Sequence, residues 1–382
     1  FTTVQRGNKS GLRELQKDFE RYFPLDKDRD LESWKNDFWR DIEPLLKASI
    51  PQPPLQVATS SEHLPVRKLR EIGRIWSGLS LRLTNSGMAS EALKYSRGIL
   101  WLSALVEAQA NLGHWHEVPL LRNFLLDIGC WAFLNTLRKL DLSWTEAKGL
   151  DAWFIELEAS ARPFSRLAKE NVDFLSHWPE VIQADSGAAK ESAGMAFQFA
   201  YGGPELVRRS AEVVIGDLLF LNPEPWDKAE PVVKKVIERM ENLRLTSLKG
   251  SAWSVILFFA VTPGAMLREV ALCNRFNGIH VIAIRCLENL TVLRGCRLAM
   301  MCNAYKNAAG RLPPDLNALE KWWGTSLPPD PFSGQPFQYR EVSGTIQLFS
   351  LGENLKADPV GSVSVDETTF LKVDGDDLHF LW

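Results

Sequence analysis

The stretch GRLPPDLNALEKWWGTSLPPDPFSGQPFQY, residues 310–339, decides how the last part of the chain folds. Gly310 suits the left-handed position that ends a helix, and Pro313 prevents the helix from continuing. The pair Pro314-Asp315 then starts a short second helix, whose apolar side chains recur at helical spacing. The stretch therefore predicts that a long helix stops at residue 309 and that a helix of about two turns follows.

The same stretch ends in a turn that leads into strands. Asp330 and Pro331 suit the first two positions of a type I turn, and Gly334 can adopt a positive φ. Residues 337–342 and 345–351 alternate in the manner of strands on either side of Ser343-Gly344, which predicts a hairpin. A polar loop of about 22 residues follows, and residues 376–382 form a final strand. These elements predict a small α+β module in which a long helix precedes a three-stranded antiparallel sheet.

The residues before this module are predominantly helical in pattern. Residues 1–49 contain two amphipathic helices, and the prolines of residues 50–64 favour an extended linker or strap. From residue 65 onward, helices alternate with short joints such as TNSG, DLSW and NPEP, which carry residues that cap or end helices. Helices joined this closely stack antiparallel. The prediction is a mainly α protein, an irregular antiparallel bundle or solenoid over residues 65–261, with the α+β module in residues 262–382.

Composition excludes several classes of function. The chain has 382 residues, of which 45% are apolar and 24% charged, so it can bury a large core. A net charge of −3 gives no basic surface for nucleic acid, and we expect no nucleic-acid partner. The longest strongly apolar run, residues 252–261, is about half the roughly 20 residues that a membrane span needs.

The cysteines and the arginines near the module are expected to have structural roles. The five cysteines lack a CxxC pair and their number is odd, so we expect small buried apolar side chains and neither a disulfide framework nor zinc. Arg285, Arg294 and Arg297 lie among polar positions of the helix that ends at residue 309, and we expect them to be solvated or paired locally.

Four segments of the last part of the chain occur in an order that resembles a known family. They are YKNAAGRLPPDLNAL, LPPDPFSGQPFQY, LFSLGEN and DDLHF. Over residues 301–382 their order and spacing are similar to the C-terminal pattern of the major pseudopilin of type II secretion systems. The apolar assembly helix of a pilin is replaced here by about 300 residues of helical sequence, so the resemblance implies a borrowed module.

The combination of a helical body with this module resembles a group of uncharacterised envelope-associated proteins of planctomycetes and verrucomicrobia. In that group an N-terminal membrane helix precedes the body. The resemblance implies the ectodomain of a membrane-anchored protein on the extracytoplasmic side of the bacterial envelope, periplasmic or surface-exposed. We therefore expect a membrane anchor upstream of Phe1.

The pseudopilin resemblance also implies a calcium site. In that family the loop after the Ser-x-Gly strand end and the closing acidic motif hold Ca²⁺ through carbonyl and carboxylate oxygens, the ligands this cation prefers. Residue by residue, the carbonyl of Leu351 and the carboxylate of Asp377 match, and Asn354 stands where an aspartate is usual. Asp358, Asp374 and Asp376 would supply further oxygens. A solvated acidic loop is the alternative interpretation.

No catalytic motif is evident in the sequence. The sequence contains no HExxH, Walker loop, GxGxxG or GxSxG, and the cluster His114-Trp115-His116-Glu117 is expected to cap or face solvent. Our first hypothesis is a non-enzymatic envelope protein that presents a helical surface to a protein partner. The alternatives are a component of a type II secretion or pilus-like assembly, and a hydrolase with a site in the helical body.

Overall fold

The computed structural model describes residues 50, 66–109, 117–173, 204–248, 273, 276, 278–342, 345–356, 371–374 and 377–381. These residues are mainly helical and include a small antiparallel sheet, as predicted. The predicted N-terminal helices of residues 1–49 lie outside the described residues. The strap apart from Ile50, and the predicted boundary between residues 261 and 262, also lie outside them.

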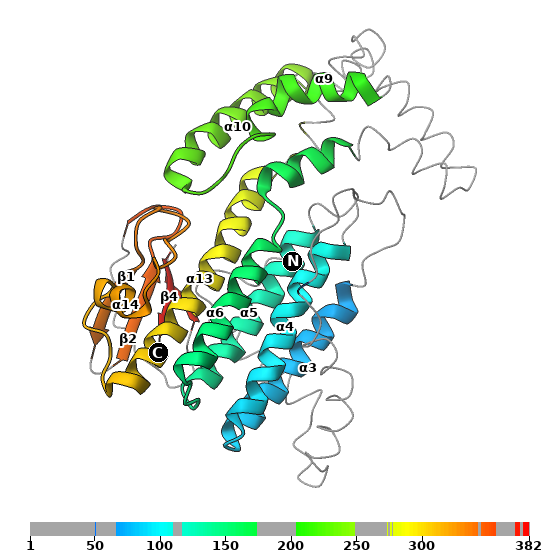
Figure 1. Cartoon of the computed structure of the whole chain (residues 1–382). Helices are drawn as coiled ribbons and strands as arrows, with labels where there is room; N and C mark the ends of the chain where they lie inside the picture. Colours follow the sequence, from blue (N-terminus) through cyan, green and yellow to red (C-terminus); the bar gives the residue numbers. More distant parts are fainter. Residues whose placement is uncertain are drawn as a thin grey trace.

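Helices account for most of the described chain (Figure 1). Their bounds are α3 Val66–Asn85, α4 Ala89–Gln109, α5 Glu117–Leu137, α6 Trp144–Ala159, α9 Pro204–Ile215, η2 Gly216–Leu218, α10 Trp226–Leu248, α13 Ile279–Ala309 and α14 Leu316–Trp323. Two predicted joints are confirmed. Gly87 has a φ of 81° between α3 and α4. Ser143 caps α6 in a capping box with Glu146, which satisfies the first free N–H groups of the helix.

The predicted ends of the long and short helices in the module are also confirmed. Gly310 ends α13 with a φ of 68°, and its N–H donates to the carbonyl of Lys306. Asp315 caps α14 by accepting a hydrogen bond from the N–H of Ala318. Gly334 has a φ of 68°, as the predicted turn requires. Because glycine and proline act locally, the sequence was sufficient to place these ends.

The sheet has four antiparallel strands in the order β1-β2-β4-β3. The strands are β1 Gln338–Val342, β2 Thr345–Ser350, β3 Leu371–Asp374 and β4 Asp377–Leu381. Val342 pairs with Thr345, which places the β1–β2 connection at residues 343–344 as predicted. The prediction of three strands was wrong because β3 lies within the expected polar loop. Only four residues long, β3 is too short to show clear alternation, and its pairing with β4 defines it.

The long helix α13 lies between the sheet and the other helices (Figure 1). One side contacts β2 and β4, and the opposite side contacts α5 and α6. The built Cβ position of Gly295 would lie 2.2 Å from the ring of Phe380, so only glycine allows β4 to pack this closely. Since α13 is covered on several sides, it carries buried apolar residues around most of its circumference.

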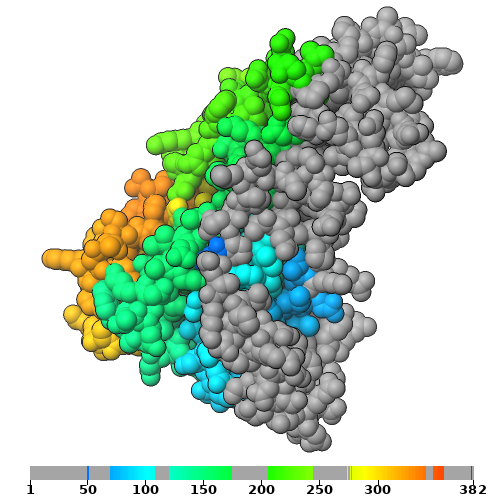
Figure 2. Space-filling view, turned by 45° about the vertical axis from the view of Figure 1, so that its right-hand side comes forward, coloured from blue at the N-terminus to red at the C-terminus, as the bar shows by residue number. Residues whose placement is uncertain are grey.

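The described apolar core consists of two clusters that share α13. The first joins α3 to α6 with the second half of α13, α14 and the sheet. The second joins residues 164–172, α9 and α10 with the first half of α13 and with Phe332. On the surface drawn in Figure 2, light green residues of α10 lie beside orange residues of the C-terminal module, and the N–H of Trp226 donates to the carbonyl of Phe332 at 2.9 Å. The core therefore continues from one end of α13 to the other.

The prediction that the cysteines are buried is confirmed for four of the five. Cys130, Cys273, Cys296 and Cys302 are buried, Cys286 is partly buried, and all five carry thiols in this structure. Over the described ranges, none of the helices has the length and apolarity needed to cross a bilayer.

Candidate functional site

Arg297 of α13 is buried and joins α6 to the C-terminal module. Its Nε and Nη2 atoms lie 2.9 and 2.8 Å from Oδ1 of Asp151 on α6. The other oxygen of Asp151 accepts a hydrogen bond of 3.3 Å from the indole N–H of Trp323 on α14. Because both Asp151 oxygens are used, this carboxylate connects α6, α13 and α14.

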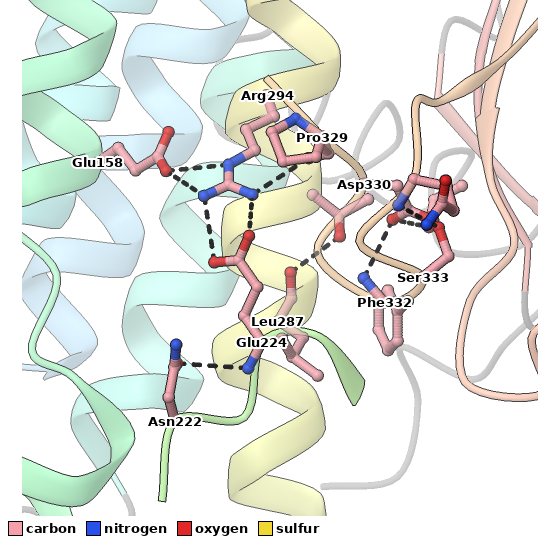
Figure 3. A network of polar contacts seen from close by, with 12 residues as sticks. Glu158, Asn222, Glu224, Leu287, Arg294, Pro329, Asp330, Phe332 and Ser333 are labelled. Atoms are coloured by element: carbon pink, nitrogen blue, oxygen red, sulfur yellow. Dashed lines mark hydrogen bonds and ion pairs between the residues drawn. The ribbon is translucent and has the colours of Figure 1, made fainter. Parts of the chain in front are cut away.

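Arg294, one turn earlier on α13, connects three more parts of the chain (Figure 3). Its Nε and Nη2 donate to Oε1 of Glu158 on α6 at 2.9 and 2.6 Å. Its Nη1 donates to the carbonyl of Pro329 at 3.1 Å. The carboxylate of Glu224, in the segment before α10, accepts hydrogen bonds from both Nη atoms of Arg294, and the bond from Nη2 is 3.2 Å long. We call Asp151, Glu158, Glu224, Arg294 and Arg297 the arginine network.

The electrostatics of Arg294 follow from this pairing. Burial by itself lowers the pKa of its guanidinium, but the hydrogen bonds and charges of Glu224 and Glu158 outweigh burial and raise the pKa. Removing one partner of a buried pair leaves the other charge without compensation, which costs about 3–5 kcal/mol. The arginine network therefore fixes the relative positions of the segments that meet there.

The expectation that the arginines are solvated or locally paired was wrong for Arg294 and Arg297 and correct for Arg285, which pairs with Glu288. The partners of Arg294 are 136 and 70 residues away, so helical spacing could not indicate them. One signal was available: Asp151 and Glu158 lie seven residues apart on the apolar face of α6. A carboxylate on an apolar face predicts a buried counter-charge.

A second buried network lies beside the first. Arg122 of α5 lies 3.5 Å from Oε1 of Glu107 and donates to the carbonyl of Leu157 at 3.3 Å. Arg162 donates to the Glu107 carbonyl at 2.5 Å and to Glu170 at 2.7 Å. Burial raises the pKa of Glu107, and the charges of Arg122 and Arg162 oppose this rise. The two networks meet at the end of α6, where Leu157 and Glu158 are neighbours.

Asp330 links two motifs of the sequence, the turn that begins at Asp330-Pro331 and the Ser-x-Gly end of β2 at Ser350. Its carboxylate is buried and accepts hydrogen bonds from the N–H of Phe332 at 3.2 Å, Ser333 Oγ at 2.9 Å and Ser350 Oγ at 2.7 Å. Ser350 Oγ also accepts from the N–H of Gly352 at 3.2 Å. The aspartate of the Pro-Asp-Pro turn and the serine that ends β2 therefore form one structural unit.

The predicted calcium ligands are only partly within the described residues. Ser350 pairs with Leu378, so Leu351 and Asp377 lie at the same end of the sheet, as a shared site would require. The side-chain oxygen of Asn354 accepts a hydrogen bond of 2.7 Å from the N–H of Lys356, which uses one of its lone pairs in a turn.

The remaining predicted ligands, Asp358 and Asp376, lie outside the described residues, and so does the side chain of Asp377. Within the described ranges, no group of three or more His, Cys, Asp or Glu side chains is placed to hold a metal ion. The loop that follows β2 contacts α13, where Nε2 of His280 lies 3.0 Å from Oε1 of Glu353.

The remaining candidate sites are the cluster of residues 114–117 and a cleft on α10. The cluster of residues 114–117 lies outside the described residues, apart from the backbone of Glu117. An open cleft of about 430 Å³ runs along α10 and is lined by Lys235, Glu238, Arg239, Asn242 and Leu243. Arg239 is already engaged with Asp217 at 3.2 Å and with the carbonyls of Val213 and Val214.

No protein-family model, curated protein or solved structure matches the chain. In both networks, arginine guanidinium groups pair with carboxylates of other helices or segments. These pairs hold the packed elements in fixed relative positions.

Proposed function

We propose that this protein is a non-enzymatic structural or interaction protein of the bacterial cell envelope. On this proposal the chain is the extracytoplasmic part of a membrane-anchored protein. The helical part is an irregular antiparallel bundle, and its surface binds a protein partner. The pseudopilin-like module is built into the bundle as a structural element.

The arginine network is the observation that carries this proposal. Its five charged side chains come from α6, α13 and the segment before α10, and they also bind Pro329 and Trp323 of the module. Catalysis requires acids and bases that face a substrate. Here the buried charges are used to hold parts of the protein together, which is the requirement of a rigid binding scaffold.

The partner surface that we propose is the outer side of α9 and the turn that follows it. Leu206, Val213 and Phe220 are spaced seven residues apart, and Val213 and Phe220 are 59% and 81% exposed. Seven-residue spacing places Leu206 and Val213 on the same side of α9. Exposed apolar side chains in such a row suit contact with an apolar helix face of a partner protein.

Site-specific photo-crosslinking in the native bacterium tests this proposal. A photoreactive phenylalanine analogue at Val213 is expected to give one discrete crosslinked product with another envelope protein. The same analogue at Glu156, which is exposed on the distant helix α6, is the matched control and is expected to give none. Crosslinking at neither position, or equal crosslinking at both, would contradict the proposed surface.

The proposed location has its own measurement. Protease added to the outside of spheroplasts is expected to digest the protein, while a cytoplasmic control protein stays intact. Protection of the chain until the membrane is lysed would rule out an extracytoplasmic position, whatever the crosslinking result.

A second candidate function is a role in a type II secretion or pilus-like assembly, with a calcium-stabilised C-terminal loop. The pairing of Ser350 with Leu378 favours it because Leu351 and Asp377 then lie at one end of the sheet. Addition of Ca²⁺ is expected to raise the melting temperature, and Mg²⁺ is not, since calcium accepts the larger and less regular oxygen cage. If Ca²⁺ gives no shift and Asp377→Ala is equally stable, the site is refuted.

A further inference from the structure

Helices α5 and α13 run parallel and form hydrogen bonds at two positions fourteen residues apart. Nδ2 of Asn123 donates to Oδ1 of Asn289 at 3.2 Å. Fourteen residues further along both helices, Nδ2 of Asn303 donates to the carbonyl of Leu137 at 2.8 Å. Advancing by the same number of residues on both helices keeps the pairing in register, as in a parallel coiled coil.

The layer midway between these two contacts is occupied by cysteines on both helices. Cys130 is seven residues after Asn123, and Cys296 is seven residues after Asn289. Both side chains are 0% exposed and belong to the first apolar cluster. Burial, and next the neighbouring Cys296 thiol, raise the pKa of the Cys130 thiol. In a parallel helix pair, the two residues that face each other in one core layer lie close enough for their Cβ atoms to reach the separation found in disulfides.

We propose that Cys130 and Cys296 form a disulfide that links α5 to α13 when the protein folds in an oxidising compartment. The proposal rests on the extracytoplasmic location proposed above, because disulfides persist there and thiols stay reduced in the cytosol. Cys273, Cys286 and Cys302 remain thiols. This assignment uses two of the five cysteines and leaves the other three as thiols.

The reaction is a thiol–disulfide exchange with a disulfide oxidant, such as oxidised glutathione or a disulfide oxidoreductase. The thiol of one cysteine loses its proton to solvent, and the resulting thiolate attacks a sulfur of glutathione disulfide. A mixed disulfide forms, and one glutathione thiolate leaves. The second cysteine thiolate then attacks the protein sulfur of the mixed disulfide and releases the other glutathione. Two protein thiols are oxidised, and one glutathione disulfide is reduced to two thiols.

The structure also indicates when this exchange occurs. Burial raises the pKa of the Cys130 thiol well above its ordinary value, so few thiolates exist once the core has formed. With no exposed surface on either sulfur, the oxidant cannot reach them in the folded protein. The exchange must therefore take place before α13 packs against α5, and afterwards the same burial protects the bond from reductants.

The test is a thiol count on the full chain. The protein is unfolded, refolded with either reduced or oxidised glutathione, freed of glutathione, and titrated with a thiol reagent in denaturant. We expect all five thiols after reducing refolding and three after oxidising refolding. Mass spectrometry of the unreduced digest is expected to show one cross-linked peptide pair, containing Cys130 and Cys296.

Two variants make the result specific. Cys130→Ala leaves four cysteines and is expected to titrate as four thiols under both conditions. Cys302→Ala, in the same helix α13, also leaves four and is expected to lose two of them on oxidation. Five thiols in the wild-type protein after oxidising refolding, or a bond that joins any other pair, would overturn the proposal.

Failure of the pair can be distinguished from failure of the proposed location. Acid quenching and alkylation of native cells reports the oxidation state in vivo. A pair that oxidises after purification but is fully reduced in cells would contradict the oxidising compartment and leave the geometry intact. A pair that does not oxidise in either setting would contradict the inference itself.

Discussion

At the scale of single residues, Asp330 connects the turn after α14 to the sheet of the C-terminal module. Its buried carboxylate accepts hydrogen bonds from Phe332, Ser333 and Ser350 and so holds the turn against the end of β2. Asp330→Ala leaves the Phe332 N–H and the Ser350 hydroxyl without this acceptor. We expect a loss of about 2–4 kcal/mol in the free energy of unfolding, measured by urea denaturation.

Ser333→Ala is the matched control for this substitution. It removes the hydrogen bond to Asp330 and the one that Ser333 Oγ accepts from the exposed N–H of Gln335. The other two hydrogen bonds on Asp330 stay, so the expected loss is below about 1 kcal/mol. Equal losses for the two variants would show that Asp330 does not organise the turn.

Asp127, on α5, gives a prediction for the dependence of stability on pH. Burial, and next the nearby carboxylate of Glu288, raise the pKa of Asp127 to about 7, while Arg285 opposes the rise. In the unfolded chain an aspartate loses its proton near pH 4. Between these values the native state holds the extra proton, so the contribution of Asp127 to stability falls as pH increases from about 4 to 7.

Asp127→Asn removes this titration and is expected to stabilise the protein at pH 8 relative to wild type, by on the order of 1–3 kcal/mol. At pH 4 the two proteins should be similarly stable. Urea denaturation at both pH values measures the difference, with the exposed Asp141→Asn as control. If the difference in stability between wild type and Asp127→Asn does not change with pH, the raised pKa of Asp127 is contradicted.

At the scale of elements, the packing of β4 on α13 depends on Gly295. A Cβ added there would lie 2.2–2.4 Å from three atoms of the Phe380 ring, and Phe380 is fully buried. Gly295→Ala is therefore expected to cost about 1–3 kcal/mol in spite of the better helix propensity of alanine. Thermal and urea unfolding measure this loss.

Gly149 in α6 is the matched control, because nothing lies within 4 Å of its built Cβ. Gly149→Ala is expected to stabilise the protein by about 0.5–1 kcal/mol through helix propensity alone. The opposite signs of the two changes are the diagnostic result. A stabilising Gly295→Ala would mean that the sheet does not pack on this side of α13.

The elements that could be predicted from sequence are those whose ends depend on neighbouring residues. Gly310, Asp315 and Gly334 fix the ends of α13 and α14 and the following turn, because caps and left-handed positions are local requirements. Strand β3 was missed since its identity depends on pairing with β4.

The candidate site was less predictable because it, too, depends on contacts between residues far apart in the sequence. The partners of Arg294 come from α6 and from the segment before α10, at sequence separations that no helical spacing relates. Only the position of Asp151 and Glu158 on the apolar face of α6 signalled a buried counter-charge in advance.

At the scale of the whole molecule, α13 connects two apolar clusters, and the arginine network lies where they adjoin. The first half of α13 packs in the cluster with α9 and α10, and the second half packs in the cluster with α3 to α6 and the sheet. Between these halves, Arg294 binds Glu158, Glu224 and Pro329. The module and the helical part are therefore expected to behave as one unit.

The most direct test of this claim is hydrogen–deuterium exchange of Arg294→Met compared with the wild-type protein. The account predicts faster exchange at three segments far apart in the sequence: the end of α6, residues 219–226 and residues 325–330. Helices α3 and α4 should be unchanged, and Arg285→Met, which breaks the ion pair with Glu288, should leave exchange in these three segments as in wild type. Faster exchange confined to the turn around residue 294, or the same acceleration in every helix, would contradict the claim that one buried guanidinium joins these parts.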